Sequence, residues 1–189
     1  MSKSTYTLAA AALMAIGSVS PALGHEGKSA LLRAQLSGFN EVISVGGAVF
    51  SDGSGRFRGR IATNQQSIGY QLTYQVVETV ATADTQYVNQ AHLHFGQRHT
   101  TGGIIAWLCD SADNPSPVVS TPTCQSPGGT VKGTLTAVDV VALAGQGILA
   151  GDFAAWVEAV RAGAIYANVH TDAFGAGELR GQVHDRGHD

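Results

Sequence analysis

The sequence predicts an all-β fold, an antiparallel β-sandwich or barrel with a short helical insertion. The chain has 189 residues, of which 24 are glycine, and each glycine inside a helix costs about 1 kcal/mol relative to alanine. Short segments of alternating apolar and polar residues recur between turn residues, which is typical of antiparallel strands. Clear helical periodicity is confined to residues 136–163. The net charge of −3 gives no electrostatic footprint for nucleic acid, so we expect no nucleic-acid partner.

Residues 1–24 have the pattern of a secretory signal peptide. Lys3 supplies a positive charge, an apolar stretch follows from Leu8 to Ile16, and small residues stand just before a cut after Gly24. The apolar stretch is too short to anchor the chain in a bilayer. We therefore expect residues 25–189 to form a single exported domain, periplasmic or secreted, with a short polar C-terminal tail and no membrane span.

The first half of this domain is expected to consist of strands. Residues Gly46–Phe50 and Gly55–Thr63 are predicted to form a hairpin around the turn Ser51–Ser54. Arginines at alternate positions of the second arm share one face, where a solvated strand surface and an anion-binding surface are the alternatives. These arginines are Arg56, Arg58 and Arg60. The other strands expected in this half are Leu31–Leu36, Ile68–Val77 and Tyr87–Phe95.

Two short helical segments interrupt the second half. Thr136 and Asp139 have the spacing of a capping box, after which a short helix is expected. Asp152 is expected to cap a second helix, whose apolar residues recur at helical spacing and whose end is marked by Gly163. The strands expected around these helices are Gly103–Leu108, Gly129–Leu135, Ile165–His170 and Glu178–Val183.

The chain has two cysteines, Cys109 and Cys124. An oxidising compartment would join them in a disulfide. The bridge would close a loop that holds three prolines, and it would stabilise the fold by about 3 kcal/mol in the loop-entropy model. Binding of a metal ion by the two cysteines is the alternative, which the long spacing and the lack of an intervening histidine disfavour.

The histidines carry most of the functional signal. His92 and His94 are two residues apart on an expected strand, so their side chains point to the same face. Two neutral imidazoles on one face can supply two ligands of a copper, zinc or iron site. Structural hydrogen bonding of the two rings is the alternative. His170 ends a later strand, from which it would face this pair in an antiparallel sheet. His99 and His184 are candidates to complete the site, with solvent exposure as the alternative.

His25 would become the first residue of the chain after cleavage at Gly24. Its terminal amine and its imidazole would then be available to one metal ion, and copper binds such nitrogen ligands well. A disordered terminus is the alternative.

Two segments resemble the CHRD domain family, which was first described in the animal protein chordin and is common in exported bacterial proteins. They are AHLHFG at residues 91–96 and YANVHTDAFGAGELRGQV at residues 166–183. The family shows an A-H-[IL]-H-x-G stretch and, near its end, a segment like Y-x-N-[VI]-H-T-x-x-[FY]-x-x-G-E-[IL]-R-G-Q. The resemblance covers roughly residues 30–185. It implies an all-β domain and, from the animal members, protein binding. Glu41 stands in an N-E-V segment that the family often carries.

A second resemblance is local. Residues 92–96 are similar to the H-V-H-x-F-G stretch of copper-zinc superoxide dismutases, with one residue fewer before the phenylalanine. That resemblance implies copper binding by His92 and His94. The zinc loop and the bridging histidine of those enzymes have no counterpart in the sequence, so a mononuclear copper site is the variant left open.

Arg180 is the catalytic candidate that goes with this hypothesis. Its fixed charge would steer a small anion such as superoxide toward a metal ion. A salt bridge with Glu178 or Asp172 is the structural alternative. Asn168 and Gln182 are expected to hold imidazole tautomers.

The leading hypothesis is an exported CHRD-type protein that binds one redox metal through histidines. Copper is favoured over iron or zinc, and superoxide dismutation by a mononuclear copper site is the candidate activity. A non-catalytic protein-binding module and a copper storage or delivery protein are the alternatives. The chain is expected to act alone or as a homo-oligomer.

Overall fold

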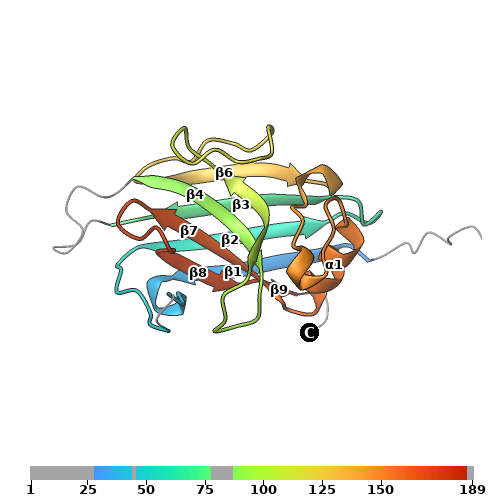
Figure 1. Cartoon of the computed structure of the whole chain (residues 1–189), viewed down its shortest axis with the longest axis horizontal. Helices are drawn as coiled ribbons and strands as arrows, with labels where there is room; N and C mark the ends of the chain where they lie inside the picture. Colours follow the sequence, from blue (N-terminus) through green and yellow to red (C-terminus); the bar gives the residue numbers. More distant parts are fainter. Residues whose placement is uncertain (1–27, 44–45, 78–86, 187–189) are drawn as a thin grey trace, which may run out of the picture.

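The computed structural model describes residues 28–43, 46–77 and 87–186. Within them, strands form one antiparallel sheet in the order β5-β4-β7-β8-β1-β2-β3-β6, and β9 pairs with β1. The sheet curls into a nearly closed barrel (Figure 1). The predicted all-β fold is therefore confirmed. The strands are β1 (Ala30–Ser37), β2 (Ser54–Ile61), β3 (Ile68–Gln75), β4 (Val88–Phe95), β5 (Gly103–Cys109), β6 (Gly128–Leu135), β7 (Ile165–Thr171), β8 (Leu179–Gln182) and β9 (His184–Asp185).

Strands β1, β2 and β3 have one buried and one solvated face. Burial alternates from residue to residue, as expected for a sheet with a single covered side. Leu32, Phe57 and Leu72 point into the barrel and are 2% exposed or less. The arginines of β1 and β2 occupy the solvated face. This alternation is the pattern from which the strands were predicted.

Strands β4 and β7 differ because both of their faces are covered. Every residue of β7 is buried, and nearly every residue of β4. Leu93 and Val169 belong to the apolar core inside the barrel. The residues at the alternating positions are polar or aromatic, and they are buried on the outer face of the sheet. This outer face is where the candidate site lies.

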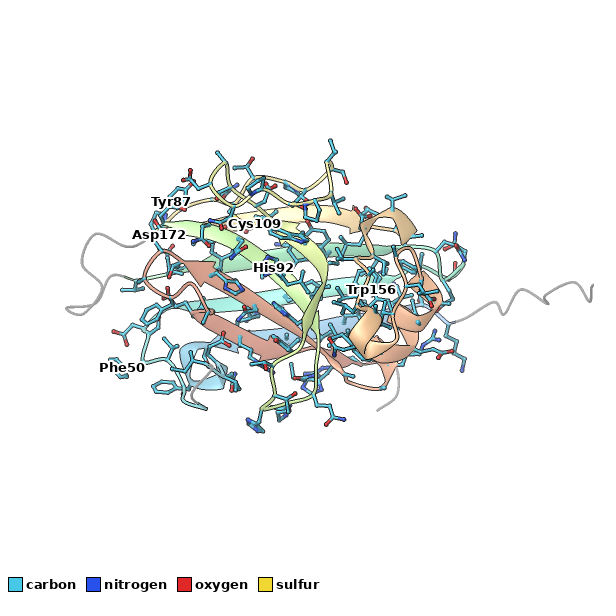
Figure 2. All side chains as sticks on the ribbon, viewed as in Figure 1. Phe50, Tyr87, His92, Cys109, Trp156 and Asp172 are labelled. Atoms are coloured by element: carbon cyan, nitrogen blue, oxygen red, sulfur yellow. A yellow bond between two sulfur atoms is a disulfide. The ribbon has the colours of Figure 1, made fainter. Side chains whose placement is uncertain are left out.

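Helix α1 (Phe153–Arg161) lies at one end of the barrel (Figure 1). Asp152 caps it by accepting a hydrogen bond from the backbone N–H of Ala155 at 3.0 Å, and Gly163 follows its end with a φ of 66°. Trp156 is fully buried and joins the core from this end of the molecule (Figure 2). The predicted cap, helix and terminating glycine are confirmed.

Two predicted elements are wrong. Residues 46–50 form no strand, and β2 pairs with β1 and β3 instead of with them. The reason is that Val49 donates its backbone N–H to Gly38, which holds the segment against the 3-10 turn Gly38–Asn40. The capping box at Thr136 is present, but only the 3-10 turn Ala137–Asp139 follows it. The chain then leaves this turn because the N–H of Val141 bonds to β5 instead of to the preceding turn.

The C-terminal end of the described chain differs from the predicted polar tail. His184 and Asp185, expected in a polar tail, form β9 and extend the sheet beside β1. The predicted signal peptide and His25 lie outside the described residues. No helix among the described residues is long and apolar enough to cross a membrane.

The predicted disulfide is confirmed, since Cys109 at the end of β5 is bonded to Cys124. We expect the Cys109→Ala/Cys124→Ala variant to lose about 3 kcal/mol of unfolding free energy, because the unfolded chain regains the freedom of a loop of 15 residues. Urea denaturation measures this loss. Wild-type protein under reducing conditions should match the variant, and a loss below about 1 kcal/mol would contradict the prediction.

Candidate metal centre

The pairing register of β4 with β7 gathers three histidines. His92 lies opposite Asn168, His94 opposite Tyr166, and Gln90 opposite His170. These residues share the outer face of the sheet, since Tyr166 is buried yet does not belong to the core cluster inside the barrel. Figure 2 shows His92 in the middle of the molecule, well away from Trp156 at the α1 end.

Three loops cover this outer face. They are residues 38–43 and 46–53 after β1, 96–102 after β4, and 172–178 after β7, and each loop contributes a hydrogen-bond acceptor to a side chain of the sheet. As a result His92 is fully buried, and His94 and His170 are 8% and 6% exposed. The site is a buried polar layer between the barrel wall and its loops.

The imidazoles are close enough to share one ion. One ring nitrogen from each of His92, His94 and His170 lies within 4.8 Å of the other two. The closest pair is Nδ1 of His92 and Nε2 of His170 at 3.2 Å. Two nitrogens bound to one tetrahedral ion at about 2.0–2.1 Å lie about 3.3–3.4 Å apart. The spacing therefore fits two ligands of one metal as well as it fits a hydrogen bond.

Backbone carbonyls orient two of the rings. Nδ1 of His94 donates to the carbonyl of Gly102 at 2.9 Å, and Nδ1 of His170 donates to the carbonyl of Gly175 at 3.0 Å. A carbonyl only accepts, so in both rings the proton is on Nδ1 and the lone pair on Nε2. A hydrogen bond to the other ring nitrogen is the usual way in which proteins hold a metal-binding histidine.

Two of the ring nitrogens have no partner in the described structure. Nε2 of His92 and Nε2 of His94 are buried and make no hydrogen bond with any described residue. Leaving a buried polar atom unpaired costs about 1–3 kcal/mol. A metal ion would satisfy the Nε2 lone pair of His94, so the residues present fit such an ion.

Burial also keeps the rings neutral. It lowers the pKa of His92 and of His170, and the neighbouring rings lower that of His92 further. Burial lowers the pKa of His94 to about 4, although its bond to Gly102 acts in the opposite direction. Neutral imidazole is the form that binds a metal, so these rings need no deprotonation near pH 7.

Tyr166 and Trp107 complete the immediate surroundings. The ring of His94 stacks on Tyr166 with centroids 4.7 Å apart, and Trp107 on β5 meets His92 edge to face at 4.3 Å. Neither aromatic residue was predicted for the site. Tyr166 stands four residues before His170 in β7, so strand periodicity alone places it on the same face.

Arg180 anchors the loop over the site. It is 2% exposed, lies 3.5 Å over the ring of Tyr166, and donates to the carbonyls of Gln97 and Thr100. The carboxylates considered as its partners are engaged elsewhere, Glu178 with Ser51 and Thr171, and Asp172 with Asn89. The structure thus gives Arg180 a positioning contact, while its effect on an incoming anion stays a prediction.

Glu41 lies in the same buried layer. Its carboxylate accepts hydrogen bonds from the side chain of Asn168 and the N–H of Val42, and burial raises its pKa. Gly177 has a φ of 124°, and a side chain there would collide with Glu41 and Asn168. Asn168 and Gln182 bond to groups other than the imidazoles, so their predicted control of the tautomers is wrong and the loop carbonyls perform that role.

The other candidate histidines lie apart from the cluster. His184 is exposed and its Nε2 lies 3.1 Å from the guanidinium of Arg98. His99 is exposed in the loop after β4 with a φ of 63°. Neither belongs to the group of neighbouring ligand atoms. The structure therefore brings together His92, His94 and His170 alone among the described candidates.

We expect the metal-free chain to lose stability as the pH falls from about 6.5 to about 4. The unfolded chain binds a proton at His94 near pH 6.5, whereas the folded chain does so near pH 4, so His94 alone makes acid favour unfolding by up to about 3 kcal/mol. Urea denaturation in the presence of a chelator measures this loss. His94→Gln should reduce the dependence without removing it, because the pKa values of His92 and His170 are also lowered, and the exposed control His99→Gln should leave it intact. Equal slopes in wild type and His94→Gln would contradict the prediction.

Comparison with protein families gives one match. The model of the CHRD domain matches residues 32–183, which include both β4 and the β7–β8 segment. No curated protein and no solved structure matches the chain. The match spans most of the sequence, and it includes all three clustered histidines and the loops that cover them. The chain belongs to the CHRD domain family.

Proposed function

We propose that this protein is exported and binds one copper ion through His92, His94 and His170, and that it removes superoxide. The observation that carries the proposal is the unpartnered, buried Nε2 of His94, together with one ring nitrogen from each of His92 and His170 within 4.8 Å of it. A purely structural cluster would leave the Nε2 lone pair of His94 unsatisfied.

The donor set favours copper. It consists of imidazole nitrogens alone, and both cysteines of the chain are used in the disulfide. Among divalent first-row metals copper binds such nitrogen sites most tightly. Three protein ligands also leave a coordination position open, as catalytic metal sites require. Zinc would fit the same ligands with lower affinity, which makes metal identity the first matter for experiment.

Bound copper would supply the one-electron cycling by which two superoxide ions and two protons become dioxygen and hydrogen peroxide. The chain's own residues would hold the ion, keep the ligands neutral and exclude bulk water. His94 and His170 retain slight exposure, which suits a diatomic substrate better than a large one. Arg180, next to Asn168 in the β7–β8 ladder, adds positive charge near the site.

Export is supported by the disulfide, because such bonds persist in oxidising compartments. It also agrees with residues 1–24, which have the sequence pattern of a signal peptide.

We expect His92→Ala, His94→Ala and His170→Ala each to abolish stoichiometric copper binding, because each removes one of three ligands. The matched controls His99→Ala and His184→Ala remove exposed imidazoles outside the cluster and should bind copper like wild type. Elemental analysis of purified protein and electron paramagnetic resonance of the copper-loaded form make the comparison. Loss of copper in either control, or retention in His92→Ala, would refute this ligand set.

We expect the copper-loaded protein to accelerate superoxide decay above the background of free copper. Pulse radiolysis measures the decay directly. Arg180→Gln should lower the second-order rate constant of superoxide decay and weaken the dependence of this constant on ionic strength, because the steering charge is lost. Stoichiometric copper without dismutation would instead support storage or delivery, and protein without any stoichiometric metal would support a binding module.

A further inference from the structure

A basic groove lies on the solvated part of the same outer face, beside the buried site. Its volume is about 860 Å³. Six of the eight arginines of the chain line it, although the net charge of the chain is −3. They are Arg33, Arg56, Arg58, Arg98, Arg161 and Arg186. Such a concentration on one surface is a property of the fold, because composition alone would not produce it.

The strand ladders place like charges side by side on the groove floor. Arg33 of β1 is directly opposite Arg58 of β2, and His184 of β9 is directly opposite Arg33 on the other side. Like charges in directly opposed positions destabilise a sheet. A fold that keeps two arginines in this arrangement gains from an anion that bridges them.

Three of the other arginines contact side chains that carry no negative charge. Arg56 donates to the side chain of Gln35 at 3.3 Å, Arg98 meets His184, and Arg161 donates to Gln65. These contacts orient the guanidinium groups without cancelling their charge. Asp185 is the single acid among the lining residues.

The charges converge from segments that are distant in the sequence. The floor comes from β1 and β2, and the walls come from the loop after β4, the C-terminal end of α1 and the residue after β9. Groups that surround one space suit a compact ligand better than a long flat one. Guanidinium groups match phosphate and sulfate oxygens with paired, charge-assisted hydrogen bonds.

The lining also argues against two other classes of ligand. It contains no phenylalanine, tyrosine or tryptophan side chain on which nucleic-acid bases would stack. Its apolar members are two alanines and a glycine, which offer little to an acidic peptide with apolar side chains. We propose that this groove binds a compact polyanion that carries several phosphate or sulfate groups.

The test uses two probes that share this chemistry but differ in source, inorganic tripolyphosphate and a heparin-derived tetrasaccharide. Calorimetric titration of the full chain in metal-free buffer should show stoichiometric binding of at least one of these two probes. Binding of tripolyphosphate alone would identify a free oligophosphate as the ligand, and preference for the tetrasaccharide would identify a sulfated glycan.

The variant Arg33→Ser/Arg58→Ser should bind at least about tenfold more weakly, because it removes charge-assisted hydrogen bonds from the floor. The matched control Arg60→Ser/Lys132→Ser removes the same charge from the same sheet outside the groove and should change affinity less than about threefold. Thermal unfolding checks the fold, and the floor variant should be at least as stable as wild type because it relieves repulsion.

Equal weakening in both variants would overturn the proposal, because binding would then follow net charge alone. So would the absence of binding to both probes, or tighter binding of a short single-stranded DNA or of tetraglutamate. His92→Ala should bind the probes like wild type, so that failure of the copper site and failure of the groove remain distinguishable.

Discussion

The register between β4 and β7 is the constraint on which the rest of the site depends. Strand side chains alternate between faces, so a slip of one residue would turn His92 and His94 into the barrel and expose Leu93. The correct register is held from the inside, where Leu93 and Val169 pack in an apolar core that charged or polar rings would not enter. The same packing that stabilises the barrel therefore determines which side chains meet on its outer surface.

The loops turn that outer surface into a site. Their carbonyls at Gly102 and Gly175 accept the Nδ1 protons and thereby leave the lone pairs of His94 and His170 on Nε2, inside the cluster of imidazoles. Arg180 secures one of these loops through two further carbonyls. Most of the organisation around the imidazoles is thus supplied by backbone atoms, and their positions depend on how the loops fold against the sheet. Preorganised ligands of this kind bind an ion with little rearrangement.

The sequence was informative wherever the spacing of residues along a strand or helix and the chemistry of neighbouring residues determine the local structure. Spacing of two placed His92 and His94 on one face, and the cap at Asp152 located α1. The sequence was uninformative where a segment bonds to residues that are far from it along the chain. Residues 46–50 look like a hairpin arm, yet they bond to Gly38, and the groove walls come from segments that only the closed barrel brings together. Every residue has a backbone carbonyl, so the sequence could not indicate which carbonyls fix the tautomers of the imidazoles.

The loop of residues 96–102 belongs to both surfaces. Gly102 orients His94 within the buried layer, while Arg98 four residues earlier lines the basic groove. A ligand that shifted this loop at one place would shift it at the other, which would link the two binding free energies. Such linkage is reciprocal, so the factor by which an occupied groove changes affinity at the imidazoles equals the factor by which an occupied imidazole site changes affinity in the groove. If both sites are occupied, a short stretch of backbone would thereby provide this small barrel with a route for heterotropic control.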